Sequence, residues 1–411
     1  MAKTLVYQLY PLAWKTGFKG MIEHLPRIAA LSADYVWLSP IYDSPFKDGG
    51  YDVTNYKQVS RRFEHYNRFR EFVEQAHALG LGVVMDLPIN HTSTSHHWFK
   101  SHPEYYCWSR QDYHGWHNLF DNGSAWHYLE EAGKYYLHLF HPTQADLQWF
   151  TYQEVGAAAN HGSQLNWTLV YEFREIVEYW LDQGVDGFRI DFPQGINKDF
   201  SSMTLEPKDL FFGDKAIDVI NAVFAKYEDI FLMVECFDPT MGGIVKHYAN
   251  NTPVDFVCNV LLKDEIRWGE GHLLHIIDAE ACNSHFMLEL ESNDSPRLPS
   301  RGVKPKDMVL DMFGSSAEGI CLYQGQELGL SNPSKGKLPD AKLLKLDAQT
   351  AMRHAKGEEL DQLRPLSRAN ARVHLPLGEY GYQERDPDSC LNYTKSWIRR
   401  WRATGVAAQA S

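Results

Sequence analysis

Eight short, apolar, β-rich runs recur along the chain, and they constrain its fold more than any other feature. Amphipathic segments with helical spacing lie between most of them, for example at residues 69–79 and 170–181. Alternation of short buried strands with helices predicts parallel βαβ units, and eight such units close as a (β/α)8 barrel. The runs lie at residues 5–9, 35–38, 82–87, 187–190, 231–234, 256–260, 286–290 and 320–323.

An open, doubly wound sheet is the alternative fold for this alternation. In such a sheet the ligand-binding residues gather at one switch point in the strand order. Here polar residues follow many different runs, which is typical of a barrel. We therefore predict the α/β class, as a (β/α)8 TIM barrel with a small inserted domain after the third strand.

Two connections are too long to be ordinary loops. Residues 92–146 are dense in His, Trp and Tyr, and we predict that they form an inserted domain B over the barrel mouth. The barrel would then comprise residues 1–91 and 147–405, with a tail at 406–411. The second long connection, at 328–385, precedes an amphipathic helix at 391–401 that would complete the barrel. That arrangement leaves no room for a separate C-terminal β-sandwich domain.

The net charge indicates which kind of ligand the protein binds, and the cysteines indicate the cellular compartment. A formal net charge of -13 disfavours nucleic acid and anionic membranes, so a neutral small ligand is expected. The first residues lack the features of a secretory leader, and no apolar run is long enough to cross a bilayer. The cysteines are scattered without a CxxC pair, which indicates free thiols and a cytoplasmic protein. They are Cys107, Cys236, Cys258, Cys282, Cys321 and Cys390.

Three acidic side chains each follow an apolar run, and they indicate glycoside cleavage. A retaining glycosidase needs two carboxyl groups about 5–5.5 Å apart, one as nucleophile and one as acid. Asp191 and Glu235 are the predicted pair. Arg189 shares a strand face with Asp191 and is expected to keep that carboxylate ionised. Glu235 follows the apolar run 231–234, where a partly desolvated carboxyl suits a general acid.

Asp294 is expected to act differently from the other two acids. Arg297 lies three residues away and is expected to hold Asp294 ionised, so Asp294 would bind sugar hydroxyls in the distorted transition state. Taken singly, each acid also fits a helix cap or a loop ion pair. Their joint occurrence after successive runs favours one active site.

Together these motifs resemble the α-amylase superfamily, which is glycoside hydrolase family 13. The resemblance covers nearly the whole chain, from residues 8–11 to the last predicted helix. Within that superfamily the chain is similar to the oligo-1,6-glucosidase and dextran glucosidase branch. The supporting stretches are residues 48–52, 90–93, 123–126, 144–147, 323–329 and 367–372.

The resemblance implies that Asp191 is the nucleophile, Glu235 the acid/base and Asp294 the transition-state stabiliser. It also implies a set of residues that bind the sugar or support the site. In the exo-acting branch an Asp and an Arg pair across the pocket and admit only chain ends; Asp48 and Arg372 match them. The sugar-binding set is Asp48, Tyr51, Asp86, His91, Arg189, Asn293 and Arg372, with Tyr51 stacking on glucose and Asp86 supporting the site from beneath.

Other readings stay open for several side chains. Tyr51 and Trp126 also fit core or lid packing, and Lys198 fits either an entrance subsite or a solvated surface. His96 and His97 are adjacent, so in extended chain they would point apart and bind no metal. Residues 15–20 lack the Asp and Asn run that binds calcium in many relatives. We therefore predict no metal and no cofactor.

Two departures from the family pattern affect specificity. Asn293 replaces the usual histidine before the third acid, so a donor to the bound sugar changes from a ring nitrogen to an amide. Residues 192–194 replace the small or β-branched residues that correlate with α-1,4 or α-1,6 preference in relatives, so no linkage is predicted.

The sequence therefore predicts a retaining, exo-acting α-glucosidase for short oligosaccharides or disaccharides, working through a glucosyl-Asp191 intermediate. A transglucosidase or sugar isomerase that uses the same intermediate is the nearest alternative. A non-catalytic binding protein of the superfamily is the other, although such relatives usually lose an acid. No oligomeric state is predicted.

Overall fold

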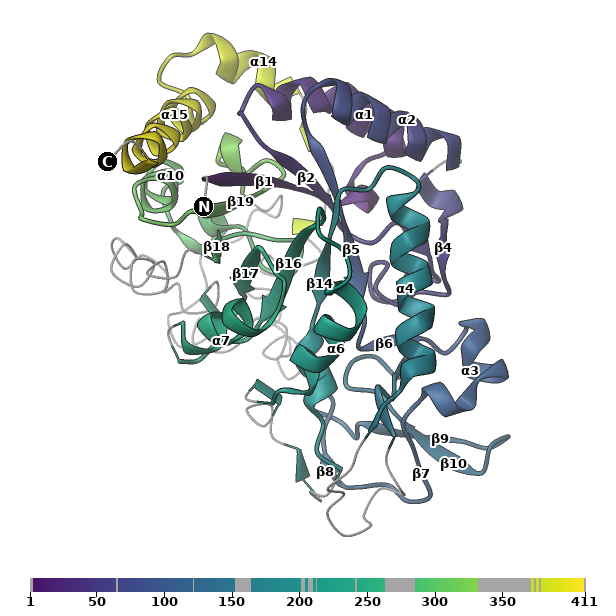
Figure 1. Cartoon of the computed structure of the whole chain (residues 1–411). Coiled ribbons are helices and arrows are strands. Elements are labelled where there is room, and N and C mark those ends of the chain that lie inside the picture. The colour runs from purple at the N-terminus through teal and green to yellow at the C-terminus, as the bar shows by residue number, and fades with distance from the viewer. Residues whose placement is uncertain are drawn as a thin grey trace, which may run out of the picture.

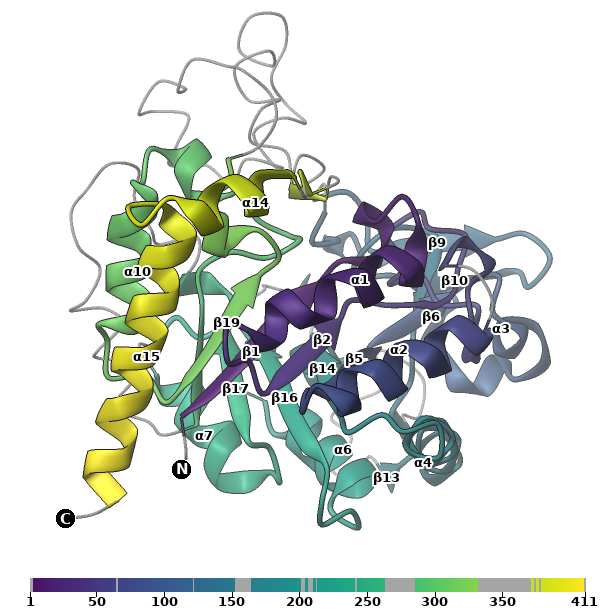
Figure 2. The same ribbon diagram turned by 90° about the horizontal axis from the view of Figure 1, so that it is seen from above.

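Eight parallel strands close into a barrel that forms the body of the molecule (Figures 1 and 2). In ring order they are β1, β19, β18, β17, β16, β14, β5 and β2, so the first strand seals the barrel by pairing with β19. The computed structural model describes residues 3–63, 66–120, 122–151, 164–200, 204–205, 210–211, 213–240, 242–262, 285–331, 371–372, 375–376 and 378–409.

Each of the eight predicted runs is a barrel strand, with ends that differ from the prediction by two residues at most. The runs are continuously apolar because both faces of a parallel strand are buried, one by the barrel interior and one by helices. The strands are β1 (Thr4–Leu9), β2 (Tyr35–Leu38), β5 (Gly82–Pro88), β14 (Gly187–Asp191), β16 (Phe231–Cys236), β17 (Phe256–Asn259), β18 (Phe286–Glu289) and β19 (Gly319–Tyr323).

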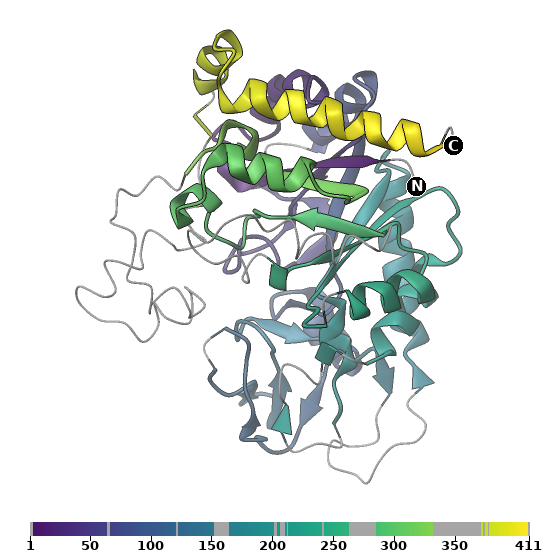
Figure 3. The same cartoon turned by 90° about the vertical axis from the view of Figure 1, so that its left-hand side faces the viewer.

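Helices follow the strands and cover the outside of the barrel, as βαβ units require. The helices expected at 69–79, 170–181 and 391–401 are present, and Figure 3 shows the last of them lying along α10. The covering helices are α1 (Gly17–Ala29), α2 (Tyr66–Ala78), α4 (Trp167–Leu181), α6 (Lys215–Phe224), α7 (Gly243–Asn251), α10 (Pro305–Phe313) and α15 (Cys390–Gln409).

The long connection after β5 carries its own small strands, as its length indicated. A three-stranded sheet has the order β7 (Trp108–Ser109), β10 (Lys134–Leu137) and β9 (Trp126–Leu129). β6 (His91–Ser93) pairs with β11 (Gln144–Asp146), and the short helix α3 (His97–Ser101) lies between them in sequence. Figure 1 shows these elements grouped beyond one end of the barrel. The exact limits of domain B stay a prediction.

The barrel interior is a packed core whose upper layer supports charged residues. One buried cluster brings together side chains from several strands, including Val6, Trp37, Val84 and Met233. The Arg189 guanidinium carbon lies 5.0 Å from the centre of the Trp37 ring, so the ring forms a floor beneath that cation. The apolar packing ends where the polar strand ends begin.

Two further expectations were met in part. The described cysteines Cys107, Cys236, Cys258, Cys321 and Cys390 are free thiols, whereas Cys282 lies outside the described residues. Of the second long connection, 328–385, most also lies outside them. Within the part of the chain that is described, none of the helices combines the length and the apolar character that a membrane span requires.

Candidate active site

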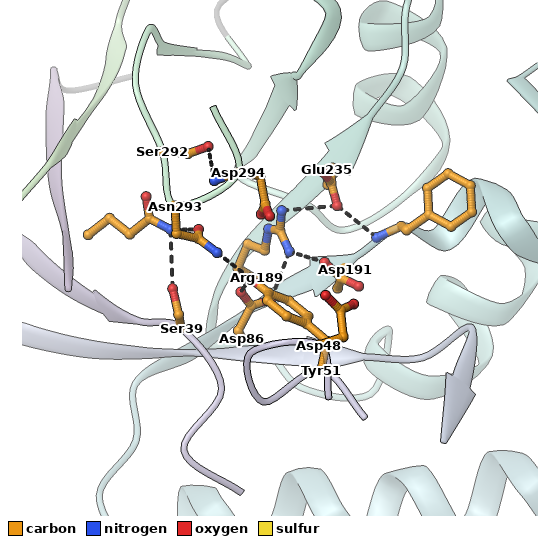
Figure 4. Close-up of polar contacts among 12 residues, drawn as sticks. Ser39, Asp48, Tyr51, Asp86, Arg189, Asp191, Glu235, Ser292, Asn293 and Asp294 are labelled. Carbon is orange, nitrogen blue, oxygen red and sulfur yellow. Dashed lines mark hydrogen bonds and ion pairs between the residues drawn. The ribbon is translucent and has the colours of Figure 1, made fainter. Parts of the chain in front are cut away.

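One arginine joins three acidic side chains at the end of the barrel (Figure 4). Arg189 Nη1 donates to Asp86 Oδ1 at 2.8 Å and to Asp191 Oδ1, and its Nη2 lies 3.0 Å from Glu235 Oε2. The side chain of Arg189 is 5% exposed, and those of Asp191 and Glu235 are 12% and 14% exposed. The predicted nucleophile and acid therefore converge on one guanidinium, where a ligand can reach both.

The register of three neighbouring strands produces this convergence. In β14, Arg189 and Asp191 are two residues apart and share a face, as the sequence predicted. Arg189 pairs in register with Asp86 of β5, and β16, which carries Glu235, flanks β14 on its other side. Because parallel strands end together, all four side chains emerge at the carboxyl end of the barrel.

The sharing of one cation by three acids changes the expected ionisation of Asp191. Burial raises the pKa of Asp191; Arg189 opposes the shift, while Glu235 and Asp86 add to it. Burial likewise raises the pKa of Asp86 to about 7, against the effect of Arg189. The expectation that Arg189 keeps Asp191 ionised left out burial and the two other carboxylates that share this arginine, and these raise the pKa of Asp191.

The third acid, Asp294, has a different cationic partner from the one expected. Arg297 lies buried against Glu291, with Nη1 and Oε2 3.3 Å apart. Arg372 instead forms an ion pair with Asp294, and its Nε donates to the Asn293 carbonyl at 2.8 Å. The side chain of Asp294 remains 42% exposed, so it can still contact a ligand.

Asn293 has a defined orientation beside the acid cluster. Its Oδ1 accepts a hydrogen bond from Gln8 Nε2 at 2.8 Å, so its Nδ2 points to the Tyr51 hydroxyl, 3.4 Å away. Tyr51 in turn donates to Asp86 Oδ2 at 2.9 Å. These contacts connect the Asn293 amide to the acid cluster. Gln8 was part of a family motif in the sequence, but its role could not be inferred there.

Asp48 and His91 are joined by a residue that sequence reasoning did not assign. Gln144 is fully buried; its Nε2 donates to Asp48 Oδ2 at 3.1 Å and lies 3.0 Å from His91 Nε2. Its Oε1 accepts from the backbone N–H of His141 at 2.9 Å, which fixes the amide orientation. Its presence in the family-like stretch 144–147 was the only signal that could have identified it.

Arg372 was expected to pair with Asp48, but it forms its ion pair with Asp294 and lies close to Asp48. The ion pair of Arg372 is made with Asp294, yet Arg372 also lies beside Gly49, next to Asp48 in the chain. Burial acts against the charged form of Arg372, but the carboxylates of Asp294 and Asp48 outweigh it and raise the pKa. The two acids thus act on one arginine at the rim of the site.

Two of the open readings are decided by packing. Lys198 is neither solvated nor at the surface: its Nζ lies 3.0 Å from Asp146 Oδ2, and the two side chains are 2% and 0% exposed. Trp126 is buried against Tyr113 and Trp116, with ring centres 5.7 Å and 5.9 Å away, as core packing requires.

The adjacent histidines were expected to point apart, and they do not. The rings of His96 and His97 stack with centres 4.6 Å apart, because His96 caps α3 and the chain turns into that helix at His97. His96 Nδ1 accepts the backbone N–H of Trp98 and caps that helix. Among the described residues no cluster of three or more His, Cys, Asp or Glu side chains is suited to hold a metal ion.

Comparisons with known proteins find relatives among hydrolases and glucosidases. The chain is 35% identical over 429 residues to trehalose-6-phosphate hydrolase of Escherichia coli, a match that covers 90% of this chain and 74% of that protein. It is 31% identical over 382 residues to the Bacillus subtilis protein of the same name, covering 80% and 65%. It is 36% identical over 215 residues to oligo-1,6-glucosidase of Parageobacillus thermoglucosidasius, covering 48% and 35%.

A solved structure resembles the whole chain. The trehalose-6-phosphate hydrolase of Bacillus licheniformis superposes with a TM-score of 0.78 at 26% identity, covering 97% of this chain and 83% of that one. The chain spans 65% of the length of the B. subtilis relative, less than two thirds. The family description "Alpha amylase, catalytic domain" matches residues 15–375. With that match over most of its length, the chain belongs to the α-amylase family.

Proposed function

We propose that this protein is a retaining, exo-acting α-glucosidase that removes terminal glucose from short α-glucosides in the cytoplasm. The contact of one buried guanidinium with both Asp191 and Glu235 is the observation that carries the proposal. It brings a nucleophile and an acid together where one sugar ring can lie between them, as double displacement requires. The names of the relatives, hydrolases of small glucosides, support the same reaction class.

In the first step the Asp191 carboxylate attacks the anomeric carbon and forms an ester bond to it. The glycosidic bond breaks, its electron pair passes to the leaving oxygen, and Glu235 gives that oxygen a proton. Arg189 stays in contact with both carboxylates throughout. It therefore stabilises Glu235 as the acid becomes an anion, while Asp191 loses its charge to the ester.

In the second step water attacks the same carbon from the side of the departed group. Glu235, now ionised, takes a proton from the water, and the bond to Asp191 breaks and restores the carboxylate. Glucose leaves with its original anomeric configuration. If another sugar replaced water as acceptor, the product would be a new glucoside rather than free glucose.

The rim residues support cleavage from chain ends. Asp48 is held by Gln144, and Arg372 is held by Asp294 and the Asn293 carbonyl. These polar groups, with His91, Tyr51 and Asp86, surround the place of the terminal glucose in the proposed site. Hydroxyl groups of a non-reducing end would satisfy them, whereas an internal glucose carries a further sugar in that direction.

Product analysis tests the proposal. The purified protein is incubated with maltose, isomaltose, trehalose, sucrose and trehalose 6-phosphate, and the products are separated by chromatography. The last substrate is included because two relatives carry its name. We expect free glucose from at least one substrate and loss of that activity by several orders of magnitude in Asp191→Asn. New disaccharides as the main product would show a transglucosidase or isomerase, and no turnover would indicate a binding protein.

A further inference from the structure

We infer that the turn after the nucleophile, Phe192–Gln194, is a brace that positions the acid/base Glu235 relative to Asp191. This inference rests on the proposed function and deepens it. The brace makes two separate contacts: the backbone of Phe192 binds the side chain of Glu235, and the side chain of Gln194 binds a residue just after the strand that carries Glu235. Neither residue is predicted to touch the reacting atoms, so both are positioning residues.

The first contact depends on an unusual backbone conformation. Phe192 has φ 37° and ψ 54°, in the left-handed region that residues with a side chain rarely occupy. In this conformation its N–H points to Glu235 Oε2, at 3.0 Å. The backbone N–H immediately after Asp191 thus donates a hydrogen bond directly to Glu235. A residue placed in strained backbone at a reacting site is typical of an arrangement maintained for function.

Aromatic packing holds Phe192 in place. Its ring lies edge-on to Phe140, with centres 5.0 Å apart, and to Phe237, with centres 5.4 Å apart. Gly195 lies directly beneath: a Cβ at that position would come within 2.7 Å of the Phe192 ring and 2.3 Å of Asn90 Oδ1. The turn is therefore packed from both sides, and a side chain at Gly195 would displace it.

The second contact ties the same turn to the residues after Glu235. Gln194 is fully buried. Its Oε1 accepts the backbone N–H of Phe237 at 2.6 Å, and its Nε2 donates to the Phe237 carbonyl at 3.2 Å and to the Phe211 carbonyl at 3.1 Å. A side-chain amide thus binds both backbone groups of the second residue after the acid, as a neighbouring strand would.

These contacts determine which oxygen of Glu235 can transfer a proton. Oε2 faces two donors, Arg189 Nη2 and the Phe192 N–H. An O–H on that oxygen would face both donors, so the transferable proton belongs on Oε1. Among the described residues no hydrogen-bond partner is found for Oε1. If the brace loosened, the carboxyl could rotate and the proton would no longer point to the leaving oxygen.

The test compares substrates that differ in their need for an acid. The sugar that departs from a disaccharide is a poor leaving group and needs protonation. In contrast, α-glucosyl fluoride releases fluoride with little help from an acid. The ratio kcat/KM reports the steps up to the first irreversible one. The later step, in which Glu235 acts as a base toward water, therefore does not affect this ratio. We expect Gln194→Met to reduce kcat/KM by about 10–100-fold on the disaccharide and by no more than about threefold on the fluoride.

A matched control comes from the 3-10 helix that continues the turn, Pro193–Asn197. Asn197 is also buried and also binds backbone, through Nδ2 to the Leu210 carbonyl at 2.6 Å and through Oδ1 to the Ala216 N–H at 2.9 Å, but neither partner belongs to β16 or to the residues directly after it. Asn197→Leu should therefore affect both substrates alike. Phe192→Gly suits the left-handed backbone but removes the ring that holds the turn. It should also lower kcat/KM selectively on the disaccharide, and it replaces Gln194→Met in the test if Gln194→Met does not fold.

The outcomes separate this inference from the proposed function. Equal losses on the two substrates in both the Gln194 and Phe192 variants, or no loss in either, would overturn the brace while leaving the glucosidase intact. A wild-type protein that is inactive on both substrates would overturn the proposed function and the brace with it.

Discussion

The buried ion pair between Lys198 and Asp146 should contribute far more to stability than an exposed pair of the same length. Lys198 follows β14 and the short 3-10 helix after it, and Asp146 lies on β11, at the end of the long connection. Their charged atoms are 3.0 Å apart and nearly inaccessible to solvent. Lys57 and Glu175 are also 3.0 Å apart, but their side chains are 39% and 66% exposed. The two pairs thus differ mainly in burial.

The magnitude follows from the geometry. Two unit charges 3.0 Å apart attract by about 5–6 kcal/mol at an effective dielectric constant of about 20. Desolvation offsets much of this attraction, yet removing one partner leaves the other charge buried and unpaired, which costs about 3–5 kcal/mol. Lys198→Met should therefore lower the free energy of unfolding by about 3–5 kcal/mol. Lys57→Met should lower it by at most about 1 kcal/mol.

Urea unfolding followed by tryptophan fluorescence measures these differences. The double variant Asp146→Asn/Lys198→Met should be more stable than the sum of the single changes predicts, because it leaves no unpaired charge. A coupling energy of about 2 kcal/mol or more is expected from the double-mutant cycle. If Lys198→Met were no more destabilising than Lys57→Met, or if the cycle showed no coupling, burial would not be the deciding factor.

Three further predictions concern the active site. Because burial raises the pKa of Asp191, the acid limb of kcat/KM should lie at a higher pH than an ordinary aspartate would give. Asp86→Asn removes a neighbouring negative charge and should move this limb to lower pH, whereas an unshifted limb would contradict the coupling between the two acids. Asn293→Ala removes one hydrogen-bond partner from Gln8 Nε2 and one from the Tyr51 hydroxyl, so kcat/KM on the preferred disaccharide should fall by about 10–100-fold. Retention of full activity would refute a role for this amide. Asp48→Ala removes the carboxylate to which Gln144 donates. Hydrolysis of a disaccharide should decrease far more than binding of a long α-glucan, and that binding is measured by affinity electrophoresis. Equal effects on hydrolysis and binding would argue against a site for chain ends.

The barrel could be predicted from the sequence because its signal is local. Each strand, such as residues 82–88, is a short run buried on both faces, so its apolar character depends little on its partners. The positions of the two acids could be predicted for the same reason, since Asp191 and Glu235 lie where such runs end. Strand order then brings them together without further information.

The partners of the charged side chains could not be predicted, because they come from distant parts of the chain. Arg372 pairs with Asp294 across 78 positions, although Arg297 is only three residues from that acid. Lys198 reaches Asn90 across 108 positions. Proximity in sequence is a poor guide to such contacts for side chains that follow a barrel strand. Their neighbours come from other strands and loops at the same end of the barrel, which lie far away in the sequence.

Because three acids share a single cation, the binding of a sugar at this site should be linked to the binding of protons. A neutral sugar that contacts Asp191 alters how firmly this acid and its buried neighbour Asp86 hold their protons, so binding should take up or release protons although the sugar carries none. The heat of binding measured by calorimetry would then depend on the ionisation enthalpy of the buffer. Inhibitors that carry a positive charge should release protons on entering this pocket, and they should bind more tightly as the solution becomes more alkaline, until they lose their own charge.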